Sequence, residues 1–369
     1  MSMLRKLNGP QTMGNGRAFW AGFATMLVIA LLYPAVSDPY DVGNVAYLLI
    51  FTLTALGLSL MWGYTGMFSF GQTAFFGVAG YSYGVLSINL AASGAMTLLC
   101  LLGAIAVAAL FALLLGYFLI YGRVSGVFFG IVTFATTLAL AAFFGQTAGP
   151  EWAIGQARFN GFNGMIGMPP LELPWPGEVI VLEGSALYYF VLGLLLVIYL
   201  GLRVLVNSRF GNVLVAIRED PLRTELLGYD VRKYQLVAFV IGSSLAALSG
   251  GLYTAWGQFI PPASMGLPAA AMPIIWVAFS GRQDLTATMV GTFLLLLMFQ
   301  TITVYSQQYA LILMGFLLLL TVLLVPAGFV YGIGRSLSQI GRRDKSGMGP
   351  GTEPGTEPAL GARAERPSS

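Results

Sequence analysis

The sequence has little charge and no histidine. Only 9% of its 369 residues are Asp, Glu, Lys or Arg, whereas 57% are hydrophobic. Soluble domains carry about 25% charged residues, and no water-soluble fold covers so much apolar surface, so lipid must surround most of the chain. The absence of histidine excludes histidine-based catalysis, histidine metal ligands and histidine pH sensing. Because no other catalytic constellation is present, we expect neither catalytic residues nor a metal site.

The sequence also has only one cysteine, no nucleotide-binding motif and a small net charge. The single cysteine, Cys100, lies in an apolar run, so no internal disulfide is possible. No G-x-x-x-x-G-K-[ST] loop occurs, so the chain is not expected to hydrolyse nucleotide by itself. A net charge of +3 gives no support to a nucleic-acid partner. The apolar segments hold no charged residue at mid-depth, which disfavours a proton-driven carrier but leaves sodium coupling open.

What the chain does have is long apolar segments. They predict an all-α membrane protein, a polytopic helical bundle of about ten transmembrane segments with broken, Gly/Pro-rich spans. The segments are 18–36, 44–62, 66–92, 95–121, 124–145, 185–202, 234–256, 266–280, 286–305 and 309–330. Segment 266–280 is short and contains Pro268 and Pro273, so we expect a broken or partial span there. The first segment is longer than the apolar core of a cleaved signal peptide, which favours an uncleaved helix.

Basic residues lie almost entirely on one side of the predicted bundle. When the segments cross the membrane in turn, only Arg158 of the 18 Lys and Arg residues falls on the other side. This is the pattern of the positive-inside rule, so both termini are expected to be cytoplasmic. The predicted layout has a cytoplasmic N-terminal tail (1–17), a transmembrane domain (18–334) with a periplasmic loop (146–184) and a cytoplasmic loop (203–233), and a disordered cytoplasmic C-terminal tail (335–369).

A glycine-rich segment, 63–86, reads G-Y-T-G-M-F-S-F-G-Q-T-A-F-F-G-V-A-G-Y-S-Y-G-V-L. In a membrane, glycine permits close helix packing. It also permits unwound backbone beside a cavity, as in transporter sites built from broken helices. Both interpretations stay open, and a proline-rich stretch at 256–273 is a second irregular segment. The candidate residues of a translocation path are Gly63, Tyr64, Gly66, Ser69, Gly71 and Gln72.

The charged loop 203–233 carries six basic and four acidic residues between uncharged apolar runs. Its apolar residues recur at helical spacing over 212–227, and Pro221 suits the first turn of a helix, so we expect two short helices meeting near Asp220. The near balance of charge favours docking of a cytosolic protein over attraction to the membrane surface. The candidate docking residues are Arg218, Glu219, Asp220, Arg223, Glu225 and Gly228.

The loop 146–184 contains Trp152, Phe159, Phe162 and Trp175 among several glycines and prolines. Aromatic residues of this kind are found at membrane interfaces. Two interpretations remain open: an ordered surface that receives a partner protein, or an interfacial lid.

Several motifs resemble one family. The run S-R-F-G-N-V-L-V-A-I-R-E-D-P-L-R-T-E-L-L-G at 208–228 resembles the coupling region of ABC importer permeases for branched-chain amino acids. Residues 57–81 resemble the same family's glycine-rich segment, and further matches lie at 122–133, 161–171 and 323–330. Departures from the family pattern include Gln72 in place of a usual His and Pro221 in place of a usual acidic residue. They also include Asn212 in place of a usual basic residue, and S-G-R-Q-D at 280–284 where the family usually has G-G-x-G-(T/S).

The resemblance implies a permease subunit of a binding-protein-dependent ABC importer in a bacterial inner membrane. Such a subunit forms, with a second homologous permease, the path for branched-chain amino acids. Two ATP-binding cassette ATPases dock on its 212–228 loop, and a periplasmic binding protein delivers the substrate. The chain itself needs no cofactor, since ATP and magnesium belong to the ATPases. Two alternatives remain: a permease for urea or short-chain amides in the same family, and a stand-alone ion-coupled carrier.

Overall fold

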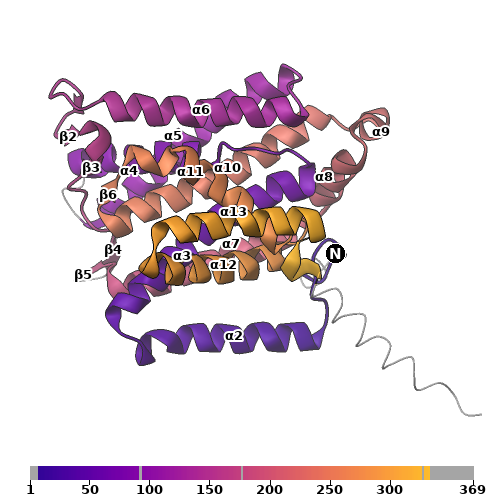
Figure 1. Ribbon diagram of the computed structural model, residues 1–369, viewed down its shortest axis with the longest axis horizontal. Coiled ribbons are helices and arrows are strands. Elements are labelled where there is room, and N and C mark those ends of the chain that lie inside the picture. The colour runs from indigo at the N-terminus through magenta and orange to yellow at the C-terminus, as the bar shows by residue number, and fades with distance from the viewer. Residues whose placement is uncertain (1–6, 91–93, 176–177, 326–327, 333–369) are drawn as a thin grey trace, which may run out of the picture.

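The computed structural model describes residues 7–90, 94–175, 178–325 and 328–332. Helices run back and forth between two ends of one bundle (Figure 1). Figure 1 shows α8 and α9 at one end, here called the charged end, and the strands at the other, here called the strand end. The long helices are α2 (Arg17–Val36), α3 (Pro39–Leu58), α4 (Gln72–Leu90), α5 (Gly94–Tyr121), α6 (Gly126–Gln146), α7 (Gly184–Val206), α10 (Val231–Gly257), α11 (Leu267–Ser280), α12 (Leu285–Tyr305) and α13 (Gln307–Leu324). The predicted disordered tail, 335–369, lies outside the described residues.

The predicted all-α membrane fold is confirmed, but the count of ten spans is not. Each of the ten apolar segments contains a helix. Within the described residues, seven helices are long and apolar enough to cross a membrane: α2, α3 with its π-helical extension, α5, α6, α7, α10 and α12. Helices α4, α11 and α13 fall short of that measure in length or composition. Whether these three also cross stays a prediction.

Helices α3 and α10 form the centre of the bundle. Helix α10 packs against α3, α4 and α5, and α3 also packs against α7. Glycines let the backbones approach: a Cβ added at Gly57 would overlap the carbonyl oxygen of Gly242, and one at Gly250 would overlap that of Phe76. Packing of small residues of this kind drives helix association in lipid, where the hydrophobic effect between helices is absent.

Helix α2 lies apart from the bundle, along one side of it (Figure 1). None of its residues is buried. It contacts α7 through aromatic residues: Phe23 stacks on Tyr199 with ring centroids 5.7 Å apart, and the Tyr188 hydroxyl donates to the carbonyl of Ala30 at 2.7 Å. Its remaining apolar surface is exposed, as expected for a helix that faces lipid.

Short strands order the loops at the strand end. Strand β1 (Ala153–Ile154) pairs with β2 (Ala157–Arg158), β4 (Glu172–Trp175) with β5 (Glu178–Val181), and β3 (Met165–Ile166) with β6 (Phe259–Ile260). The β3–β6 pair joins the loop after α6 to the proline-rich segment after α10. That segment continues in the 3-10 helix η3 (Pro262–Met265), so the irregular backbone predicted for it is confirmed over 258–266.

The glycine-rich segment is irregular only in its first part. Helix α3 continues as a π-helix, η1 (Ser59–Tyr64), and the chain is then non-helical until α4 begins at Gln72. The first residues of the apolar segment 66–92 are therefore not helical, and Gly66 takes a left-handed φ of 75° that most residues avoid. Beyond this break, α4 is regular, and its glycines pack closely on Met265, Thr254 and Met165.

Candidate functional site

The predicted docking residues lie on two short helices at the charged end. Helix α8 (Arg209–Glu219) and helix α9 (Pro221–Leu226) meet at Asp220, as the sequence predicted. Asp220 Oδ1 accepts a hydrogen bond from the Arg223 backbone N–H at 3.0 Å, and Asp220 Oδ2 pairs with Arg223 Nε at 3.0 Å. The chain leaves α9 through Gly228, which has a φ of 87° and suits a helix C-terminus.

The two helices differ in burial. Helix α8 buries Val213, Leu214 and Ile217 against the bundle. Helix α9 and the residue after it expose Leu222, Leu226 and Leu227 by 68%, 80% and 75%. Three leucines this exposed, next to the charges of Arg223 and Glu225, form an apolar patch with a polar rim, which is typical of a surface that receives another protein.

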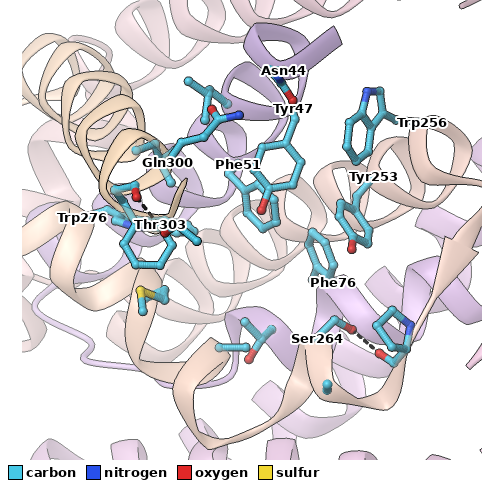
Figure 2. A pocket seen from close by; sticks show the side chains of 18 of the residues that line it. Asn44, Tyr47, Phe51, Phe76, Tyr253, Trp256, Ser264, Trp276, Gln300 and Thr303 are labelled. Carbon is cyan, nitrogen blue, oxygen red and sulfur yellow. Dashed lines mark hydrogen bonds between the residues drawn. The ribbon is translucent and has the colours of Figure 1, made fainter. Parts of the chain in front are cut away.

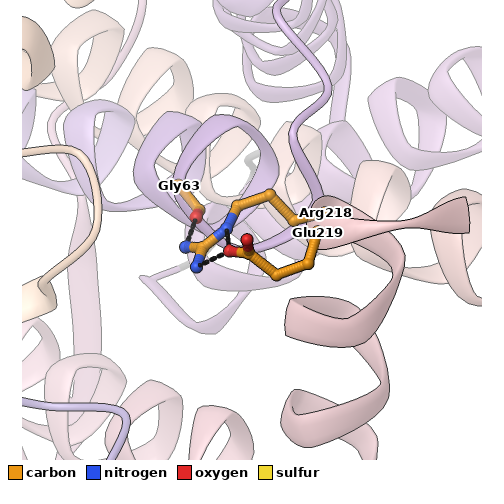
Figure 3. Close-up of polar contacts among 3 residues, drawn as sticks. All are labelled: Gly63, Arg218 and Glu219. Atoms are coloured by element: carbon orange, nitrogen blue, oxygen red, sulfur yellow. Dashed lines mark hydrogen bonds and ion pairs between the residues drawn. The ribbon is translucent and has the colours of Figure 1, made fainter.

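Arg218 joins this surface to the broken end of α3. Its Nη1 donates to the carbonyl oxygen of Gly63 at 2.6 Å, and its Nη2 pairs with Glu219 Oε1 at 2.6 Å (Figure 3). A Cβ added at Gly66 would lie 3.4 Å from the Arg218 side chain. Movement of α8 would therefore act directly on the segment where α3 ends.

The other side of η1 packs on the turn between α11 and α12. A Cβ at Gly63 would overlap the carbonyl oxygen of Arg282, and the Ser59 hydroxyl donates to that same oxygen at 3.0 Å. Thr288 of α12 lies 3.1 Å from the Ser59 hydroxyl. The π-helix is thus enclosed between α8 and the start of α12.

Residues 7–16, here called the N-terminal strap, cross the charged end and bind a buried arginine. Arg203 is fully buried; its Nε donates to the carbonyl of Leu7 and its Nη2 to that of Gly14, both at 2.6 Å. The rings of Phe19 and Trp20 lie 4.7 and 5.3 Å from the guanidinium. The sequence placed Arg203 in the charged loop, but α7 extends to Val206, so this residue lies inside the helix.

Asp284 binds the strap from the other side. Its Oδ1 accepts the Ala287 N–H at 2.7 Å and so caps α12, while its Oδ2 accepts the N–H of Met13. Burial raises the pKa of this carboxyl above its usual range, and hydrogen bonds from these backbone groups oppose the shift. Burial, and then the nearby Arg218, lower the pKa of Arg282 in the same turn. Asp284 therefore connects the strap to the first turn of α12 through two hydrogen bonds.

A groove of about 690 Å³ opens at the strand end. Its residues come from α3, α4, α10, η3 with the preceding Pro261, α11 and α12, and none of them is Asp, Glu, Lys or Arg. Figure 2 shows the lining of the groove, with Trp276, Gln300 and Thr303 on one side and the aromatic residues Tyr253, Trp256 and Phe76 on the other. The lining residues used below are Asn44, Tyr47, Phe51, Thr73, Phe76, Tyr253, Trp256, Trp276 and Gln300.

Ring contacts make the groove wall continuous. Tyr47 lies 5.1 Å from Trp256, and Phe51 lies 5.5 Å from both Phe76 and Trp276, centroid to centroid. Ligand sites are usually clefts of about 300–1,000 Å³ with mostly apolar walls and a few polar groups, and this groove has that size and character.

The six candidate path residues are not part of the groove wall, and Gly63, Tyr64 and Gly66 contact residues of the charged end. None of them lines the groove, although Thr73, the next residue along the chain, does. Gly63, Tyr64, Ser69, Gly71 and Gln72 are buried, and only Gly66 is exposed. Gln72 donates to the sulfur of Met61, and the Tyr64 hydroxyl donates to the carbonyl of Gln11 in the strap. Their part in a path stays a prediction.

Sequence reasoning missed the groove and the strap. The available signal for the groove was two amides, Asn44 and Gln300, in apolar segments where polar side chains are costly. The aromatic residues carry no comparable signal, because aromatic side chains are ordinary in membrane helices. In the part of the chain that the structure describes, no cluster of Cys, Asp and Glu could hold a metal ion.

Comparison with known proteins identifies the family. A family model described as "Branched-chain amino acid transport system / permease component" matches residues 42–322. The high-affinity branched-chain amino acid transport system permease protein LivM of Escherichia coli is 25% identical over 323 residues, which are 83% of this chain and 73% of that protein. The LivM of Salmonella typhimurium is 24% identical with the same coverage. A probable LivM of Methanocaldococcus jannaschii is 26% identical over 40% of this chain and 47% of its own length.

No solved structure gives a significant match to the chain. The family match covers most of the helical bundle, including α3, the glycine-rich break, α8, α9 and the groove. The chain therefore belongs to the family of ABC importer permeases for branched-chain amino acids.

Proposed function

We propose that this chain is the permease subunit of a binding-protein-dependent ABC importer that carries branched-chain amino acids across a bacterial inner membrane. Both termini and the charged end face the cytoplasm, and the strand end faces the periplasm. The observation that carries the proposal is the contact of Arg218 with Gly63, because it connects a docking surface to the break between α3 and α4.

Two ATPase subunits dock at the charged ends of this chain and of a second, homologous permease. The exposed leucines of α9 and the charges of Arg223 and Glu225 receive the ATPase, as an amphipathic helix enters a groove on its partner. ATP and magnesium stay in those subunits. Nucleotide binding transmits force only if it favours one arrangement of α8 over another. Arg218 then carries that preference to η1 and the broken segment.

The substrate follows the groove at the strand end. A periplasmic binding protein delivers it there, on a surface built by the strands of the 146–184 loop, where Phe162 is 82% exposed. The aromatic wall suits an apolar side chain, because burial of a leucine-sized side chain is favourable by about 1.5–3 kcal/mol. Gly66 and Gly71 lie in the break between η1 and α4, Gly63 lies in η1 beside it, and their small size permits this segment to change shape.

The test is purification of the chain from its own membrane, followed by reconstitution in vesicles. An ATPase and a second permease are expected to co-purify with the wild type and to be lost when a flexible linker replaces 212–228. ATP-dependent uptake of leucine, isoleucine or valine is expected from the wild-type complex. Uptake of urea or a short amide in their place would assign the alternative substrate, and uptake by the chain alone in an ion gradient would contradict the ABC mechanism.

A further inference from the structure

Two polar groups in the groove have no hydrogen-bond partner. Trp276 is 5% exposed and Thr73 is 6% exposed, and neither the indole N–H nor the hydroxyl makes a hydrogen bond within the described part of the chain. A buried donor without a partner is destabilising, so native proteins keep few of them, often for a function. Both residues line the same groove, so the two unsatisfied groups belong to side chains of its wall.

Both groups favour an oxygen ligand that carries negative charge. The indole N–H can only donate, and a threonine hydroxyl donates or accepts. Thr73 is the second residue of α4, a 19-residue helix that begins inside the bundle, and the N-terminus of a helix carries a partial positive charge. No basic side chain lines the groove, so dipoles rather than a full charge would hold the ligand's oxygen atoms.

The remainder of the groove suits a positive group and an aliphatic side chain. The faces of Tyr47, Tyr253 and Trp256 attract an ammonium group through their quadrupoles, and the amide oxygens of Asn44 and Gln300 accept hydrogen bonds from it. The aromatic surfaces between them bury hydrocarbon. Urea has neither a carboxylate nor an apolar part, and it would lose hydrogen bonds to water along these walls.

We propose that Trp276 Nε1 and the first turn of α4 at Thr73 form a subsite for the α-carboxylate of an aliphatic amino acid in transit. This inference rests on the proposed function, and it adds the two residues that recognise the substrate within the permease. The ammonium group lies toward the aromatic and amide groups, and the side chain lies along the aromatic wall.

The test measures equilibrium binding of radiolabelled leucine to the transporter purified from its own membrane, without the binding protein. Trp276→Phe keeps the ring and removes the N–H, and Thr73→Val keeps the shape and removes the hydroxyl. Each variant is expected to bind leucine about tenfold more weakly, because a hydrogen bond to a charged group is lost. Thr292→Val is the matched control, since it removes another unpaired buried hydroxyl that does not line the groove.

Competition with leucine methyl ester, which lacks the carboxylate charge, separates recognition from general damage. The wild type is expected to prefer leucine to the ester, and Trp276→Phe to lose that preference. Unchanged leucine binding in both groove variants, or an equal loss in Thr292→Val, would overturn the subsite. If the wild-type complex imports leucine while Trp276→Phe binds it normally, only the subsite fails. If the complex imports urea and not leucine, the proposed function fails with it.

Discussion

At the charged end, polar groups from distant parts of the chain are hydrogen-bonded to one another, whereas at the strand end the groove keeps two polar groups without partners. Arg203 binds the strap through two carbonyl oxygens, and Asp284 binds it through a backbone N–H. Trp276 and Thr73 have no such partners. The difference indicates that the two ends have different functions. The charged end is connected by hydrogen bonds and can transmit movement, whereas the groove has unpaired polar groups that can bind a ligand.

The largest effect is expected from reversing charge on the docking surface. Arg218→Glu combined with Glu225→Lys removes the bond to the Gly63 carbonyl and alters the surface beside the exposed leucines. We expect ATPase association to be lost while the bundle stays folded, as measured by co-purification and gel filtration. The matched control, Arg158→Glu with Glu178→Lys, reverses charge at the strand end and should leave ATPase association intact. Normal association of the ATPase with the Arg218→Glu, Glu225→Lys variant would contradict the assignment of this surface as the docking site.

Arg203→Met should reduce stability at the charged end. The substitution preserves much of the hydrocarbon stem but leaves the carbonyls of Leu7 and Gly14 without their buried donor. An unsatisfied buried group costs about 1–3 kcal/mol, so a total loss of about 2 kcal/mol or more is expected for the two carbonyls. Thermal unfolding in detergent measures it, with exposed Arg209→Met as the control. Equal stability of the two variants would show that the strap contributes nothing to the fold.

Gly63→Ala tests the close packing of η1. The new methyl group would overlap the carbonyl oxygen of Arg282, so η1 and the turn before α12 must separate. Overpacking of this kind costs about 1–3 kcal/mol. We expect a lower unfolding temperature and reduced coupling of ATP hydrolysis to uptake. Gly193→Ala is the control, because open space surrounds that position of α7. A variant at Gly63 as stable as the control would contradict the packing.

The smallest effect is a pH dependence from Asp284. Its pKa is raised by burial, so the folded chain binds a proton more readily than the unfolded chain over the window above the ordinary value of 3.8. Stability from this group is full below that value and is lost as the pH rises through the raised pKa. Thermal unfolding across this window should show a decline in the wild type that Asp284→Asn reduces. Asp230→Asn, at the exposed cap of α10, should leave the decline unchanged.

Local signals predicted the elements that depend on local physics. The apolar segments predicted the helices, and Pro221 predicted the boundary between α8 and α9 near Asp220, because a proline acts within one helical turn. The prediction failed where distant segments meet. Arg203 could not be placed because its partners lie in the strap, nearly 200 residues earlier in the chain.

The groove was hidden for the same reason. Its wall joins Asn44, Thr73, Tyr253, Trp276 and Gln300 from five helices, and no spacing within one segment reports that they converge. The glycine pattern left broken backbone and close packing both open, because glycine serves each of them. The sequence could not tell that Gly66 belongs to the break while Gly77 belongs to a regular helix.

The most direct test measures leucine binding and ATPase co-purification together in two variants of the purified transporter. Each variant is predicted to lose one of the two properties and to keep the other. Trp276→Phe should keep its ATPase and bind leucine about tenfold more weakly, because one hydrogen bond to the carboxylate is missing. Arg218→Glu with Glu225→Lys should lose its ATPase and bind leucine as the wild type does. Loss of both properties in either variant, or of neither, would contradict the division between the two ends.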